Sequence, residues 1–137
     1  MILGNDEIEM VRSSFEKVYT NKDEVASLFY KKLFELEPGY KAMFKGDMTE
    51  QGRKLMVMLR TLISGLGDLS SLIPVIQDMG KRHLKYGVKT QDYDVVGTAL
   101  LATLQQGLGE EFTPKLKGLW TDIYQIVAKT AIEGSKQ

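Results

Sequence analysis

The sequence predicts an all-α protein with six long helices and one short helix. Apolar residues recur at spacings of three and four along nearly the whole chain, and no stretch shows the strict alternation of a half-buried strand. Residues that start and end helices interrupt this pattern at short intervals. The 137 residues contain no repeat, low-complexity stretch or flexible linker, so we expect a single domain over 1–137.

Two capping-box patterns predict the first two helices. The pairs are Asp6 with Glu9 and Asn21 with Glu24. We expect the first helix over roughly 6–19 and the second to run from Asn21 toward Leu36. Pro38 suits the first turn of a short helix that ends near Phe44.

Four further amphipathic helices complete the prediction. Their expected starts are Asp47 or Thr49, Ser70 or Ser71, the residues after Thr90, and Thr113-Pro114. The first two are expected to end at Gly67-Asp68 and Tyr86-Gly87, and the apolar stripes of the last two extend to Leu108 and Ala131. In the second of them Leu72, Ile76, Met79 and His83 are spaced by 4, 3 and 4 residues, which places His83 on the inward apolar face.

Charge and hydropathy exclude several classes of partner. Eighteen basic and eighteen acidic residues give a formal net charge of +0, which provides no electrostatic footprint for nucleic acid or an anionic membrane surface. No apolar run approaches the ~18 residues of a membrane span. The start MILGNDEIEM lacks the basic segment followed by an apolar segment that is typical of a signal peptide. We therefore expect a cytoplasmic protein with no nucleic-acid or membrane partner.

Zero cysteines and one histidine limit the chemistry further. Without thiols there is no disulfide, cysteine-based zinc site or iron–sulfur cluster, and His83 alone cannot build a multi-histidine metal site. The chain also lacks the nucleophile-elbow, dinucleotide and P-loop motifs.

The inward position of the only histidine leaves two interpretations. In an arbitrary helical protein such a residue is more often a core histidine bonded to a backbone carbonyl. The functional interpretation needs a metal that takes one protein ligand. Haem is such a metal centre, because the macrocycle supplies four nitrogens and the protein adds one axial imidazole.

The order of residues around this histidine resembles the bacterial single-domain globins, which are related to the globin part of flavohaemoglobins. The stretch His83-Leu-Lys-Tyr-Gly87-Val88, with the later Tyr93, Val96-Gly97 and Leu100-Leu101, is similar to their proximal helix and the helix that follows. Leu28-Phe29-Tyr30, Leu33-Phe34, Pro38 and Met43-Phe44 resemble their second helix and the corner after the third, and Leu119-Trp120 with Tyr124 their last helix. The resemblance implies a globin fold around a haem pocket.

Carried over position by position, the resemblance assigns roles to twelve residues. His83 matches the proximal metal ligand of haem b, and Phe44 the aromatic residue that wedges the ring. Tyr30 and Gln51 match distal positions that donate hydrogen bonds to a bound ligand, with Leu55 as an apolar wall. Lys54 and Arg82 are candidates for pairing with the propionates. The remaining cofactor-lining residues are Met79, Val88, Tyr93, Val96 and Tyr124.

The function implied is reversible binding of O2, NO, CO or another diatomic ligand at a five-coordinate iron, with high O2 affinity from the two distal hydrogen bonds. One alternative is a nitric oxide dioxygenase that works with a separate reductase. The other is a haem-free globin-fold sensor or interaction module. The residues alone do not separate these interpretations.

Overall fold

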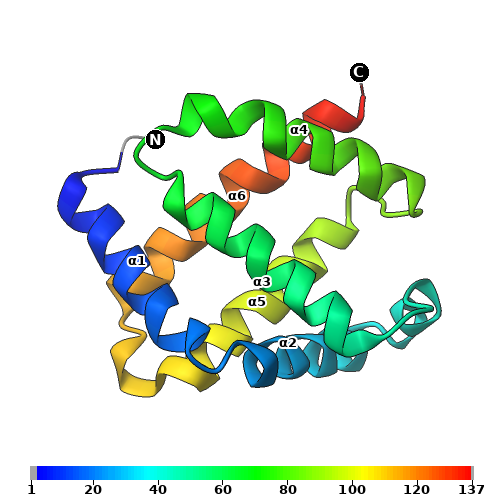
Figure 1. Cartoon of the computed structure of the whole chain (residues 1–137), viewed down its shortest axis with the longest axis horizontal. Coiled ribbons are helices and arrows are strands. Elements are labelled where there is room, and N and C mark those ends of the chain that lie inside the picture. The colour runs from blue at the N-terminus through cyan, green and yellow to red at the C-terminus, as the bar shows by residue number, and fades with distance from the viewer. Residues whose placement is uncertain (1–2, 137) are drawn as a thin grey trace.

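The computed structural model describes residues 3–136 and contains six α-helices and two short 3₁₀ helices (Figure 1). In chain order they are α1 (Asn5–Tyr19), α2 (Lys22–Leu36), η1 (Pro38–Met43), α3 (Met48–Ser64), α4 (Leu69–Lys85), α5 (Asp92–Leu108), η2 (Gly109–Glu111) and α6 (Pro114–Ser135). No strand occurs among these residues, which confirms the all-α prediction. The predicted helices do not include η2, a single turn between α5 and α6.

Two helix starts follow the predicted caps. Asp47 accepts a hydrogen bond from the Thr49 backbone N–H at 2.8 Å at the start of α3. Thr113 accepts one from the Leu116 backbone N–H at 3.2 Å at the start of α6, where Pro114 occupies the first helical position. In both cases a side-chain oxygen satisfies a backbone donor that the helix itself leaves free.

The predicted Asp6–Glu9 capping box is wrong. Gly4 is the extended residue before α1, and its backbone N–H donates to Glu7 Oε1 at 3.1 Å. Asp6 therefore lies inside the first turn, where a negative charge still favours the helix dipole.

The predicted start of α2 agrees with the structure, because the helix begins at Lys22 directly after Asn21. The predicted capping box does not form, since the Asn21 side chain makes no capping bond. The predicted start of α4 needs correction, because the helix begins at Leu69 with Asp68 as its N-cap rather than at Ser70 or Ser71. The hydroxyls of both serines donate to Asp68 from inside the first turn.

The helices pack into a main core and a smaller second core. In the main core α2 packs against α3 and α5, and α1 packs against α3, α5 and α6. The second core joins α4 to α6 through Leu72, Ile76, Met79 and Ala131, with Leu62 of α3 at its edge. Among residues 3–136, α6 is the one helix that packs extensively on α4. α4 is therefore held from one side.

A close crossing attaches α4 to α6. A Cβ atom on Gly80 would lie 1.9 Å from the backbone oxygen of Ala131, and one on Gly134 would lie 2.5 Å from Cα of Gln77. Only glycine at these two positions lets the backbones approach so closely.

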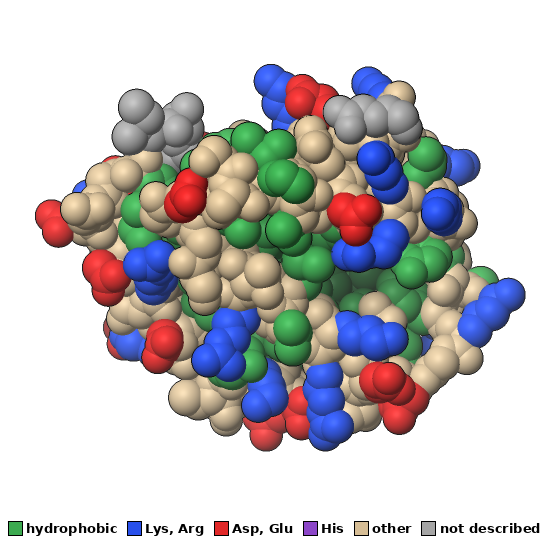
Figure 2. Space-filling model, turned by 45° about the horizontal axis from the view of Figure 1, so that its top comes forward, with side chains coloured by type: hydrophobic (Ala, Val, Ile, Leu, Met, Phe, Trp, Pro, Cys, Tyr) green, Lys and Arg blue, Asp and Glu red, His purple; other side chains and the backbone are tan. Residues whose placement is uncertain are grey.

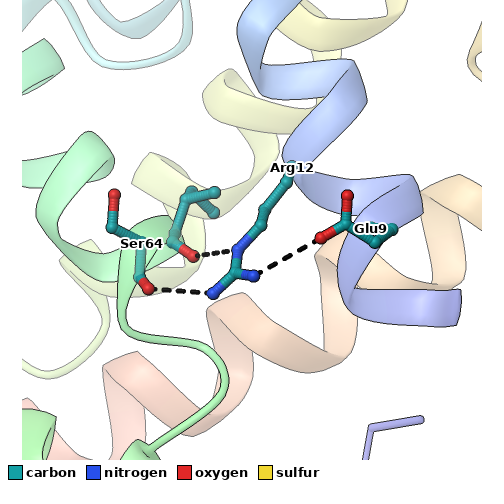
Figure 3. Close-up of polar contacts among 4 residues, drawn as sticks. Glu9, Arg12 and Ser64 are labelled. Atoms are coloured by element: carbon teal, nitrogen blue, oxygen red, sulfur yellow. Dashed lines mark hydrogen bonds and ion pairs between the residues drawn. The ribbon is translucent and has the colours of Figure 1, made fainter. Parts of the chain in front are cut away.

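Arg12 joins α1 to the end of α3 (Figure 3). Its guanidinium donates to the backbone oxygens of Ser64 at 2.9 Å and Ile63 at 3.4 Å, and it lies 3.5 Å from Glu9 Oε1. A cation at the end of a helix satisfies carbonyls that have no partner within the helix. Arg12 thereby stabilises the turn from which α4 begins.

Within residues 3–136, no helix is both long enough and apolar enough to cross a membrane.

We expect Gly80→Ala to lower the free energy of unfolding by about 3 kcal/mol, because the added methyl group would force α4 away from α6. Gly118→Ala, also helical but with nothing within 4 Å of an added Cβ, is the matched control. It should stabilise the protein by about 0.5–1 kcal/mol. Urea unfolding followed by circular dichroism measures both, and effects of the same sign would contradict the assignment of the crossing.

Candidate functional site

One face of the molecule is hollowed on the side where α3 and α4 diverge. In Figure 1 these helices are joined by the short turn at residues 65–68 and open like a V toward the right of the view. The space-filling view in Figure 2 shows a hollow on this side, lined with hydrophobic side chains and bordered mainly by Lys and Arg. Because α4 packs mainly on α6, its other side is free to line this hollow.

His83 lies in the last turn of α4 and is half-buried. Its Nδ1 is 2.8 Å from the backbone oxygen of Met79, one helical turn earlier. A carbonyl can only accept, so Nδ1 carries the proton and Nε2 keeps its lone pair. Nε2 has no hydrogen-bond partner within residues 3–136. The imidazole ring is therefore oriented, and the unused lone pair of Nε2 is suited to bind a metal.

A metal at His83 would need most of its ligands from elsewhere. Among residues 3–136 no three His, Cys, Asp or Glu side chains gather in a group that could hold a metal ion. A single protein nitrogen is the ligand set that suits a metal carried within a cofactor, which supplies the other ligands itself.

Tyr30 and Gln51 meet where α2 crosses α3. Tyr30 is 7% exposed, and its hydroxyl oxygen accepts a hydrogen bond from Gln51 Nε2 at 3.4 Å. A Cβ on Gly52 would lie 2.8 Å from the Ala26 Cβ, so this glycine lets the two helices approach and brings the pair together. The structure thus brings together the two residues that the resemblance assigns to distal positions.

The Tyr30 hydroxyl remains a hydrogen-bond donor. Burial raises the pKa of Tyr30 above its ordinary value of 10.0, and the bond from Gln51 offsets part of that rise. Because Gln51 occupies an acceptor site on the oxygen, the phenolic proton is available to another group.

Phe44 belongs to an aromatic cluster beside this pair. Its ring centroid is 5.3 Å from that of Tyr30 and 5.6 Å from that of Phe34, which the sequence analysis did not place in the site. Phe34 is found from its helical register, since it follows Tyr30 by four residues on α2. The cluster orients the half-exposed Phe44 ring.

The structure distributes the other predicted lining residues over both cores. Leu55, Val96 and Tyr124 are half-buried against the main core. Tyr93 is half-buried against the second core, and the Tyr124 hydroxyl donates to its backbone oxygen at 2.5 Å. The Met79 side chain is buried in the second core, so its bond to His83 comes from the backbone.

Val88 and Tyr93 also line a surface pocket of about 370 Å³ formed by the end of α4, the loop that follows and the end of α6. The Val88 backbone N–H donates to the His83 oxygen at 3.0 Å. Val88 thus lies in the loop after the candidate metal ligand, and Tyr93 lies in the first turn of α5.

Lys54 and Arg82, the predicted propionate partners, are both exposed. Arg82 Nη1 lies 3.2 Å from Asp78 Oδ2 on the preceding turn of α4, so its charge already has a partner. Lys54 makes no ion pair within residues 3–136. Lys54, unlike Arg82, therefore has no carboxylate within these residues that competes with an anion for its charge.

Together these features define an all-α protein with an apolar hollow, an oriented histidine on one helix and a tyrosine–glutamine pair on two others. A sequence model of the Globin family matches residues 27–131, and the chain belongs to that family. The predicted resemblance to globins is confirmed.

Known proteins that are similar to this chain are also named as globins. The chain is 30% identical to neuroglobin of Dissostichus mawsoni over 96% of this chain and 92% of that protein. It is 31% identical to neuroglobin-2 of Oncorhynchus mykiss over 92% and 88% of the two chains. The solved structure of a bacterial globin from Campylobacter jejuni shares the fold, with a TM-score of 0.83, 22% identity and coverage of 97% and 96%.

Membership of the globin family implies haem binding, and the residues present fit that cofactor. The porphyrin requires one axial ligand, which matches the free Nε2 of His83. Its ring requires apolar walls and its propionates a cationic edge, which match the hollow and its border in Figure 2.

We predict that the free energy of unfolding falls as pH rises above about 10. Folded Tyr30 retains a proton that the unfolded chain releases, because burial raises the pKa of Tyr30, and each such group contributes at most ~1.4 kcal/mol per pH unit. Tyr30→Phe removes the group, so urea midpoints of this variant should decline less steeply between about pH 10 and 12. An unchanged slope would contradict the burial of the phenol.

Proposed function

We propose that this globin binds haem b in the hollow, with His83 as its only protein ligand to iron, and binds O2 reversibly. The observation that carries the proposal is the His83 ring, oriented by the Met79 carbonyl with Nε2 unpartnered. Haem, when bound, supplies an iron that takes diatomic gases.

His83 acts through the arrangement of its two ring nitrogens. The bond from Nδ1–H to the Met79 oxygen at 2.8 Å selects the tautomer and increases the electron density on Nε2. The acceptor belongs to the backbone of the same helix, so the ring can turn little without losing this bond. The chain's role here is to hold one nitrogen in a constant direction.

Tyr30 and Gln51 are the proposed donors to a gas ligand. The buried phenol stays protonated at neutral pH, and the Gln51 amide provides N–H donors on the adjacent helix. Such preorganised donors favour a ligand that gains negative charge, as O2 does, over neutral CO. If each donor contributes about 1–2 kcal/mol, the pair slows release of O2 by roughly two orders of magnitude.

The remaining site residues would hold the cofactor by packing and by charge. Phe44, Leu55, Val96 and Tyr124 would pack against the cofactor from partly buried positions. Val88 and Tyr93 would do so from the segment after α4, while Lys54 would attract a propionate.

High O2 affinity with slow O2 release suits a protein that scavenges oxygen, senses it or uses it to consume a second reactant. It suits a protein that delivers oxygen less well. The same two donors would serve a nitric oxide dioxygenase supplied by a separate reductase. Sustained loss of NO in the presence of NADH and a generic reductase separates that enzyme from a binder, which stops after one turnover.

His83→Gly should abolish tight haem uptake, because it removes the axial nitrogen. Free imidazole should restore the absorption spectrum of the bound haem by occupying the vacated space. Lys81→Ala, an exposed position on the same helix, should bind haem as the wild type does. Haem titration of the apoprotein by absorbance measures all three, and a wild-type spectrum for His83→Gly without imidazole would refute the axial role.

Tyr30→Phe should release O2 about tenfold faster than the wild type, because one donor is lost. CO release should change far less, since CO carries little charge. Tyr19→Phe is the matched control, because its hydroxyl faces Arg60 at 3.3 Å on an exposed surface. Stopped-flow O2 release measures the rates, and equal rates for wild type and Tyr30→Phe would remove the tyrosine from the mechanism.

A further inference from the structure

A short hydrogen bond joins η1 to the first residue of α5. The Tyr40 hydroxyl donates to Asp92 Oδ1 at 2.5 Å, although the two residues are 52 positions apart. The other carboxylate oxygen, Oδ2, accepts from the Lys89 backbone N–H at 2.7 Å. One carboxylate therefore connects η1, the start of α5 and the loop after α4.

The two ends of this connection carry opposite sides of the haem site. On the η1 side, Phe44 directly follows the helix, and its backbone N–H donates to the Lys41 oxygen at 3.3 Å. Its ring packs on Tyr30, so η1 belongs to the wall that holds the distal donors. Figure 1 shows η1, in cyan, on the same side of the molecule as the loop after α4.

On the α5 side, the connection reaches the segment that follows His83. Asp92 directly precedes Tyr93, and its bond to Lys89 closes the turn that leads back to Val88. Val88 in turn donates to the His83 backbone oxygen at 3.0 Å. The Tyr40–Asp92 bond thus links the wall with Phe44 to the wall with His83.

Few other contacts hold η1 in place. None of its side chains is fully buried, and it packs mainly on α2. Within residues 3–136, the bond to Asp92 is the only side-chain hydrogen bond made by residues 38–43. A hydrogen bond to a carboxylate is among the stronger kinds, so its loss should free η1 to move.

We propose that Tyr40 and Asp92 form a latch across the open side of the pocket that slows the loss of haem. The inference rests on the proposed function, since it concerns retention of the cofactor that His83 would bind. Tyr40 and Asp92 are positioning residues that act through Phe44 and through the loop after His83.

The latch stays closed across neutral pH. Burial and the hydrogen bond to Asp92 raise the pKa of Tyr40 well above its ordinary value of 10.0. The phenol therefore keeps the proton that the bond requires.

The test is the rate of haem loss from the ferric holoprotein to an excess of a haem-scavenging apoprotein. We expect Tyr40→Phe and Asp92→Ala each to lose haem about tenfold faster than the wild type. The double variant should lose it no faster than Asp92→Ala alone, because that change already removes the bond that Tyr40→Phe breaks.

Three control variants separate the latch from general effects. Asp94→Ala removes a like charge from the same first turn of α5, and Tyr19→Phe removes a hydroxyl from α1. Thr113→Ala lowers stability by removing the α6 cap on a different helix end. All three should lose haem at the wild-type rate.

The outcomes distinguish the latch from the proposed function. If the wild type retains haem and Tyr40→Phe loses it at the same rate, the latch is refuted and the haem site stands. A double variant whose rate increase is the product of the two single increases also refutes it, because the residues then act separately. If the wild type takes up no haem, the proposed function fails and the latch fails with it.

Discussion

The close crossing of α4 on α6 is the contact on which the site depends. Glycines at 80 and 134 bring the two backbones together, and this attachment holds α4 without extensive packing on α3 or α5. An ordinary amphipathic helix would bury its apolar stripe against all its neighbours. Because α4 is held from one side, its inward face near His83 stays open toward a cofactor.

A second close crossing, of α3 on α2, forms the wall of the site that carries Tyr30 and Gln51. Gly52 lets α3 approach α2 at Ala26, and the neighbouring Gln51 then reaches the buried Tyr30 hydroxyl. Each wall therefore pairs a close helix crossing with a polar group whose direction is set by a hydrogen bond. The histidine offers a lone pair, and the tyrosine offers a proton. This complementarity suits an iron on one side and a partly negative ligand on the other.

One residue of the site, His83, follows from helical spacing and the rarity of histidine, whereas the other site residues follow from the resemblance to globins. The spacing of Leu72, Ile76, Met79 and His83 predicted an inward imidazole, and the structure places that ring on α4 with its Nδ1 bonded within the helix. The structure also brings together Tyr30 and Gln51, which were selected by resemblance alone. The starts of α1 and α4 were misplaced because several nearby residues could cap each helix, and only backbone geometry chose among them.

The sequence by itself determined the helical class, the core faces and the single imidazole, since these depend on local periodicity and composition. It did not determine that Arg82 pairs with Asp78, that Met79 contributes through its backbone, or that Tyr40 meets Asp92. Those outcomes depend on how helices distant in the chain cross and on which side chains then lie within hydrogen-bonding distance. Tertiary packing alone decides such meetings, because a pattern along one helix carries no information about the angle of its neighbour.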